Sequence, residues 1–154
     1  LSLDGHGPPK SMTRTLSTEE HGTYSPNGRW IAYQSDESGD DQVYLQRAGE
    51  GSWPDRIQVS RNGGANPRWD HEGRELLFLS AGGVTSVAID PGSGRVGTSR
   101  VLYPGRDLWS AVEGSSLEVG PDGRLFAIRR SRELAPRRIH LVLNWGAAMA
   151  TGAH

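Results

Sequence analysis

The chain has 154 residues, enough for one ordinary domain with its own core and too few for two comfortable ones. Its 17 basic and 18 acidic residues are mixed along the sequence and sum to a formal net charge of -1, which argues against a nucleic-acid partner. Cysteine is absent, which excludes disulfides and thiolate chemistry, and no apolar run approaches the roughly 18 residues that membrane insertion requires.

Glycine and proline are frequent, with 21 and 9 residues, and only 34% of the residues are hydrophobic. This composition favours many short elements joined by turns, because an internal Gly costs a helix about 1 kcal/mol and an internal Pro about 3 kcal/mol. The sequence therefore predicts an all-β fold. The opening "LSLDGHGPPK" has neither an initiator Met nor a secretory pattern, so we expect the chain to be a piece of a longer protein.

A unit of similar sequence occurs three times, at 25–36, 70–81 and 120–131. Each copy places a Gly-Arg pair directly before an apolar strand, and these pairs are 45 and 50 residues apart (Gly28-Arg29, Gly73-Arg74, Gly123-Arg124). That period suits a four-stranded propeller blade of about 40 to 50 residues. The Gly closes a tight turn, since it accepts the positive φ that such a turn requires.

The first complete unit shows how the strands are expected to follow one another. The run 30–33 is continuously apolar, which predicts a strand in mid-sheet between neighbouring blades. The acidic turn "DESGDD" then leads into 42–46, where polar and apolar residues alternate as in a half-buried strand. The segment 55–60 is predicted as the outer, fourth strand.

The remaining units follow the same register. The second predicts strands at 65–69, 76–79, 85–89 and 100–103, and the third at 116–119, 125–128 and 139–143. The first 17 residues read as the last two strands of another blade. We expect about thirteen strands in one partial propeller over 1–145, divided into blade parts of about 1–18, 19–62, 63–104 and 105–145, with a flexible tail at 146–154.

On these residues the chain resembles the TolB-like (WD40-like) propeller repeat family, and most closely the C-terminal propellers of bacterial serine/threonine kinases and regulators. The resemblance is carried by "YSPNGRWIAYQSDESGDDQVYLQ", "GGANPRWDHEGRELLFLS" and "IHLVLNW". The chain departs from the pattern at Asn27, where the family usually has Asp, and it contains no kinase domain. TolB relatives are periplasmic, whereas a kinase-linked parent leaves the bacterial periplasm and cytoplasm both open.

The resemblance implies a closed ring, which is six-bladed in TolB itself. A little over three blades cannot close a ring and would leave apolar faces and sheet edges open at both ends. We therefore expect a homodimer in which the N-terminal strands of one copy complete the three-stranded last blade of the other. An open half-ring fragment is the alternative.

Inner strands of a propeller begin near its central channel, where residues of successive blades converge. The matching positions hold carboxylates, an amide and an imidazole (Glu20, His21, Asn66, Glu113, Glu118). Trp109, in a loop, is a further candidate for contact with a ligand. We predict a binding or interaction module that holds a small molecule, peptide or protein there. The alternative is a metal-dependent hydrolase, with phosphoesters among its substrates, in which Glu20 and His21 bind calcium, zinc or another divalent cation at the propeller axis.

Two further clusters of charged residues have a simpler interpretation than a functional site. The acidic turn offers carboxylates to a cation but lacks the EF-hand spacing, so we interpret it as a solvated turn (Asp36, Glu37, Asp40, Asp41). The arginines between 129 and 138 are interpreted as a solvated hairpin. A serine hydrolase is not indicated, because the Gly-x-Ser-x-Gly elbow is missing.

Overall fold

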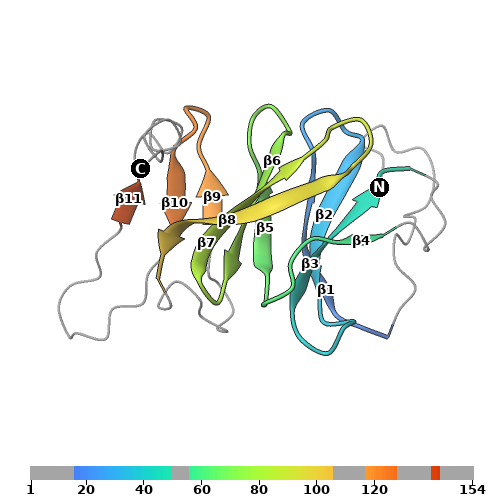
Figure 1. Cartoon of the computed structure of the whole chain (residues 1–154). Coiled ribbons are helices and arrows are strands. Elements are labelled where there is room, and N and C mark those ends of the chain that lie inside the picture. The colour runs from blue at the N-terminus through green and yellow to red at the C-terminus, as the bar shows by residue number, and fades with distance from the viewer. Residues whose placement is uncertain (1–15, 50–55, 106–116, 128–139, 143–154) are drawn as a thin grey trace, which may run out of the picture.

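A computed structural model describes residues 16–49, 56–105, 117–127 and 140–142 of the chain. These residues form eleven strands in three antiparallel sheets, and they contain no helix. The sheets stand side by side along the chain (Figure 1), and we call them the first, second and third blades. All-β architecture is therefore confirmed for the described part of the chain.

The first blade has the strand order β1-β2-β3-β4. Its strands are β1 Glu19–Tyr24, β2 Trp30–Ser35, β3 Gln42–Arg47 and β4 Ile57–Gln58. The predicted tight turn joins the first two: the Ser25 N–H donates to the Trp30 carbonyl at 2.8 Å, and Gly28 has a φ of 68°. Each strand pairs with the next in sequence, which is the up-and-down order that a blade requires.

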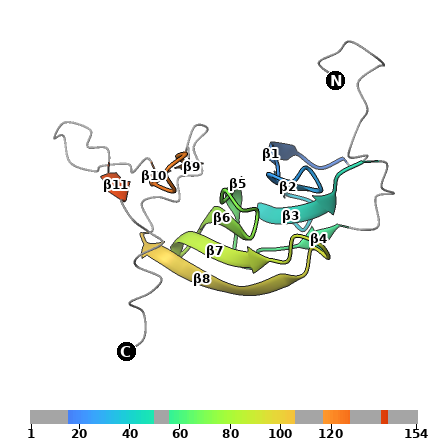
Figure 2. The same ribbon diagram turned by 90° about the horizontal axis from the view of Figure 1, so that it is seen from above.

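The second blade repeats this order, and the third has three described strands. Their bounds are β5 Ala65–Trp69, β6 Glu75–Ser80, β7 Gly83–Ile89, β8 Val96–Pro104, β9 Leu117–Val119, β10 Leu125–Ala127 and β11 His140–Val142. Viewed from above, the inner strands β1, β5 and β9 lie along one side and the long outer strand β8 along the other (Figure 2). The two strands predicted before residue 19 fall almost wholly outside the described residues.

The core lies between the blades. Alternate residues of β2 and β3 point toward the second blade, among them Trp30, Ala32 and Leu45, and they form one cluster with Leu76 and Phe78 of β6. The intervening residues of β6 point the other way and form a second cluster with the third blade (Leu77, Leu79, Val84, Leu117, Leu125). The second blade is therefore apolar on both faces, which explains its continuous apolar runs.

Strand β3 differs from its prediction. Its alternation suggested a half-buried strand, yet every residue from Gln42 to Gln46 is buried. The polar members of the pattern lie on the face of the first blade that points away from the second blade. Alternation therefore separates two buried faces here, and it does not separate core from solvent.

The third blade departs from the repeat by one residue. In the first two blades the turn closes from Ser25 to Trp30 and from Asp70 to Glu75, whereas in the third the Gly120 N–H donates to the Arg124 carbonyl. A shift of one residue turns a strand's side chains over to the opposite face. Leu125 is accordingly buried in the core while Phe126 is 41% exposed.

The joint between the first and second blades depends on Trp30. Its Nε1–H donates to the Pro91 carbonyl at 3.0 Å, and its ring lies against Gly94, which has a φ of 71°. A Cβ at Gly94 would collide with the indole ring. The contact thus requires Gly for both space and backbone conformation.

We expect Gly94→Ala to lower the free energy of unfolding by roughly 2 to 5 kcal/mol, because strain in φ adds to the collision with Trp30. Gly39→Ala is the matched control: its φ is 100°, but nothing lies within 4 Å of its added Cβ, so only strain applies. Urea unfolding followed by tryptophan fluorescence measures both. Equal losses in the two variants would contradict the packing role of Gly94.

Candidate functional site

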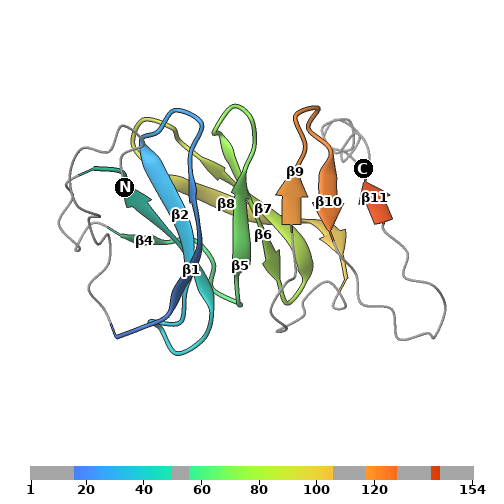
Figure 3. The same cartoon turned by 180° about the vertical axis from the view of Figure 1, so that it is seen from behind.

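The inner strands β1 and β5 share an unusual backbone feature. The pairing of β1 with β2 shifts between Glu20 and Thr23, and that of β5 with β6 shifts between Ala65 and Arg68. At the matching residue of each bulge, His21 and Asn66 have φ values of 54° and 55°. Bulges redirect side chains, and non-glycine residues at positive φ are uncommon, so both positions are locally distinctive. Figure 3 shows β1, β5 and β9 next to one another, as the channel prediction requires.

The structure describes four of the six predicted channel residues, and their surroundings differ. Asn66 is 2% exposed, and its backbone N–H donates to Gln34 Oε1 at 3.2 Å, so it belongs to the joint between blades. Glu118 accepts from Arg68 through both of its oxygens, at 2.9 and 3.1 Å. These hydrogen bonds hold the pKa of Glu118 below its ordinary value.

Glu20 and His21 remain exposed on β1, with Glu20 Oε2 and His21 Nε2 3.9 Å apart. Glu113 and Trp109 lie outside the described residues. Within the described ranges, no three His, Cys, Asp or Glu side chains come together as metal ligands would. The calcium or zinc site at Glu20 and His21 therefore stays a prediction.

The interpretation of the acidic turn as fully solvated is wrong for one of its residues. The Glu37 side chain is 6% exposed and forms an ion pair with Arg56, with Oε1 2.7 Å from Nε. Burial raises the pKa of Glu37, and the Arg56 charge opposes that shift. Asp36 accepts from the Thr18 N–H at 2.9 Å and so fixes the approach to β1. The turn is structural, and Glu37 points inward because Arg56, directly before β4, places a cation beside it.

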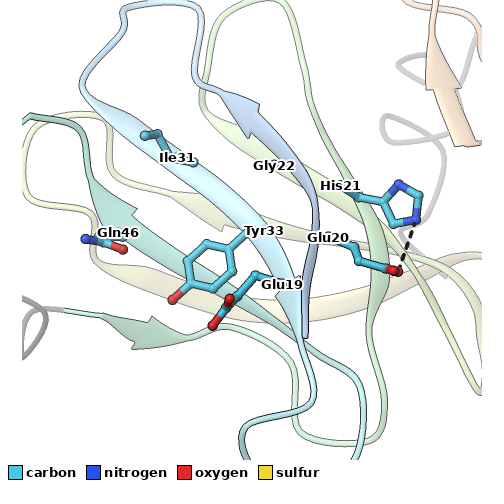
Figure 4. Close-up of a pocket in the computed structure, with 7 residues that line it drawn as sticks. All are labelled: Glu19, Glu20, His21, Gly22, Ile31, Tyr33 and Gln46. Atoms are coloured by element: carbon cyan, nitrogen blue, oxygen red, sulfur yellow. Dashed lines mark ion pairs between the residues drawn. The ribbon is translucent and has the colours of Figure 1, made fainter. Parts of the chain in front are cut away.

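A cavity of about 230 Å³ opens beside β1 (Figure 4). It is lined by Glu19, Glu20, His21, Gly22, Ile31, Tyr33 and Gln46. In Figure 4 the Glu19 side chain extends toward Tyr33, whereas Glu20 and His21 extend from the other side of the strand. Register agrees, because Glu19 pairs with Ser35 on the Tyr33 face and Glu20 pairs with Gln34.

Two buried polar atoms of the cavity lining have no hydrogen-bond partner, namely the Tyr33 hydroxyl and Gln46 Oε1. The two residues are only 5% and 4% exposed. Burial, and next the charge of Glu37, raise the pKa of Tyr33, so its hydroxyl stays protonated at neutral pH. Unpartnered buried polar atoms are destabilising and rare in folded proteins. Their presence in a cavity marks a place where a ligand can supply the missing partners.

The second blade shows that a blade does not need these polar groups. The 45-residue repeat matches Glu19 with Gly64 and Tyr33 with Phe78. The strand pairing matches Gln46 with Val87. Phe78 and Val87 pack in the core between the blades. The same architecture is thus built with apolar residues one repeat later, and of the two four-stranded blades that the structure describes only the first carries the polar set.

Sequence reasoning missed Tyr33 and Gln46, and it placed the site on Glu20 and His21. A signal was present: the 42–46 segment carries Gln46 where the second blade has Val87. Comparing the units position by position would have singled out these differences. That comparison needs the strand register, which depends on pairing across the sheet.

No protein-family model and no curated protein matches the chain. Among solved structures, TolB from Acinetobacter baumannii is similar over 75% of this chain and 27% of its own, with 20% identity and a TM-score of 0.50. A candidate 6-phosphogluconolactonase from Bacteroides uniformis is similar over 93% of this chain and 46% of its own, with 17% identity and a TM-score of 0.57.

The chain has the β-propeller fold. It spans less than half the length of either of these propeller structures, so it corresponds to a part of such a ring. At these identities the likeness concerns the fold alone, and the particular repeat family stays a prediction. Among the described residues of this partial propeller, no helix is long and apolar enough to cross a membrane.

We expect the double variant Tyr33→Phe with Gln46→Val to unfold at a higher temperature than the parent chain. Removing an unpartnered buried polar group relieves a penalty of about 1 to 3 kcal/mol, and both replacements follow the second blade. The control is Ser25→Ala, which removes a buried hydroxyl that accepts from the Trp30 N–H at 3.0 Å and should lower stability. Thermal unfolding followed by circular dichroism measures the unfolding temperatures of both variants and of the parent chain. A destabilised double variant would show that these groups support the fold.

Proposed function

We propose that this chain is a binding module built on a propeller, and that its first blade holds a ligand in the cavity beside β1. The main support for this proposal is that two buried polar atoms in the lining of one cavity, the Tyr33 hydroxyl and Gln46 Oε1, have no hydrogen-bond partner. Binding sites combine apolar walls with a few polar groups that orient the ligand, and Ile31 and the Tyr33 ring supply such walls.

The size of the cavity favours a particular kind of ligand. At about 230 Å³ it is smaller than the roughly 300 to 1,000 Å³ of pockets that enclose a drug-sized molecule. A single side chain fits such a space. A peptide or protein anchored through one residue therefore agrees with the geometry better than a large small-molecule ligand does. Anchoring residues of this kind provide much of the affinity at protein interfaces.

Selection from a displayed library of random peptides tests this function. The parent chain should enrich peptides that no longer bind the Tyr33→Phe, Gln46→Val variant, because that variant keeps the fold and loses the polar groups of the cavity. Asp40→Asn, which alters an exposed carboxylate outside the cavity lining, should bind the enriched peptides as the parent does. The absence of any peptide whose binding depends on the cavity would overturn the proposal.

We propose that a second copy of the chain completes the ring. Each end blade presents an exposed aromatic residue: Tyr24 on β1 is 61% exposed, and Phe126 on β10 is 41% exposed. The residue of the second blade that matches Tyr24 is Trp69, whose Nε1–H donates to the Thr23 carbonyl of the blade before it. Tyr24 is thus placed to receive a preceding blade. That blade would cover the face of the first blade on which the cavity beside β1 opens, so ring completion and a ligand in the cavity exclude one another. Because the chain spans 46% of the Bacteroides uniformis structure, two copies approach the length of one such protein.

Native mass spectrometry checks the assembly and the metal content together. We expect the mass of two chains, and we expect Tyr24→Asp to shift the population toward one chain, since a charge would be buried at the joint. A parent chain that stays monomeric while folded would end the dimer proposal and favour blades supplied by further sequence of a longer protein. Calcium or zinc retained in the parent and lost in Glu20→Gln would favour the alternative of a metal-dependent hydrolase.

A further inference from the structure

We infer that the side chain which enters the cavity beside β1 is Phe126 from the third blade of a second copy of the chain. This inference rests on the ring completion proposed above, and it names the residue that the partner contributes to the cavity. Because ring completion and a separate ligand exclude one another, the second copy is itself the occupant. The register of the blades, the sizes of the facing side chains and the open contacts of the first blade support it.

The joints between blades follow one register. In each blade, one residue of the second strand pairs with the same position of the inner strand and points to the following blade (Ala32, Leu77, Phe126). Ala32 shares a core cluster with Leu76 and Phe78 of the second blade. Leu77 shares the next cluster with Leu125 of the third blade. Phe126 is thus the residue with which the third blade would continue the series.

The continuation leads to the cavity. Phe126 is 41% exposed, and the first and third blades stand at opposite ends of the row of blades (Figure 1). The repeat matches Leu76 and Phe78 with Ile31 and Tyr33 of the first blade. Ile31 and Tyr33 line the cavity beside β1. A third blade that docks on another first blade in the established register therefore directs its Phe126 into that cavity.

Side-chain sizes agree with this pairing. Between the first and second blades, the small Ala32 faces Leu76 and Phe78, which are only 0% and 2% exposed. At the ends of the chain the sizes are exchanged: the entering residue is the large Phe126, and the receiving face has a cavity of about 230 Å³. An aromatic ring buries a large apolar area and also gains from contact with a second ring such as that of Tyr33.

The first blade also leaves open a contact that the second blade receives. A Cβ added at Gly73 would lie 3.1 Å from Pro26 Cδ in the turn of the first blade, whereas one added at the matching Gly28 would have nothing within 4 Å. Pro121 has the place of Pro26 in the turn of the third blade. The docking that brings Phe126 to the cavity therefore brings Pro121 to Gly28.

Fluorine NMR tests this placement directly, because the chain contains only two phenylalanines. With 4-fluorophenylalanine at both positions, Phe78 is the internal reference, since it is 2% exposed. A soluble gadolinium chelate broadens the signals of exposed rings. We expect the Phe126 signal to be broadened in dilute protein and to become as protected as that of Phe78 when higher concentration produces the dimer. A dimer in which Phe126 stays accessible would overturn the inference and leave the dimer in place.

Sedimentation equilibrium gives the contribution of the ring to pairing. Phe126→Ala should raise the dissociation constant of the dimer at least about tenfold, because buried aromatic anchors dominate interfaces. Val101→Ala is the matched control: Val101 is also an exposed apolar residue, at 49%, but it lies on the outer strand of the second blade. It should leave the constant unchanged. A parent-like constant for Phe126→Ala would contradict the inference.

Filling the cavity from the other side keeps the test decisive if Phe126→Ala fails to fold. Gly22 lines the cavity, and nothing lies within 4 Å of a Cβ added there. Gly22→Leu should therefore weaken pairing without a collision inside the single chain. Gly92→Leu is its control, because it lies outside the lining and its added Cβ meets only Asp90 Oδ1, at 3.5 Å. Unchanged pairing in folded Gly22→Leu would overturn the inference.

The outcomes separate this inference from the proposed peptide ligand. A folded chain that stays monomeric and still enriches peptides dependent on the cavity would overturn the second copy as occupant and leave the binding module standing. Paired chains with a protected Phe126, together with no enriched peptide, would overturn the peptide ligand and support the second copy.

Discussion

The burial of both faces of a blade is the constraint on which the rest of the structure depends. A strand such as β2 is buried from Trp30 to Ser35, so each side of its sheet needs a covering layer. The second blade meets this need with one apolar cluster on either face. Joints between blades, such as the contact of Trp30 with Gly94, therefore bury the apolar faces that a single blade would leave open.

The outward face of the first blade obeys the same constraint with different chemistry. Its side chains are buried, yet Tyr33 and Gln46 bring polar atoms to positions where the second blade has Phe78 and Val87. A polar group without a partner lowers stability, and the binding function proposed for this cavity would supply the missing partners. This links the packing of the blade to the function proposed for it.

Much of the fold was predictable, whereas little of the site was. The strands after Gly28, Gly73 and Gly123 were expected where they are found, because tight turns and apolar runs are local signals. The prediction of a ligand site at Glu20 and His21 was based only on their position at the start of an inner strand. In the sequence Tyr33 is only one member of the apolar run 30–33, since nothing local distinguishes a buried hydroxyl with a partner from one without.

By itself the sequence determined the period of the repeat, its turns, its all-β class and the order of strands within each blade. These properties follow from φ preferences and from side-chain alternation, which act over a few residues. Tertiary structure alone decided which face of β3 is covered, why Leu125 and not Phe126 enters the core, and that Glu19, Tyr33 and Gln46 share one cavity. The reason is physical: register and burial arise from pairing between segments far apart in the chain, and one residue of slip reverses every side chain.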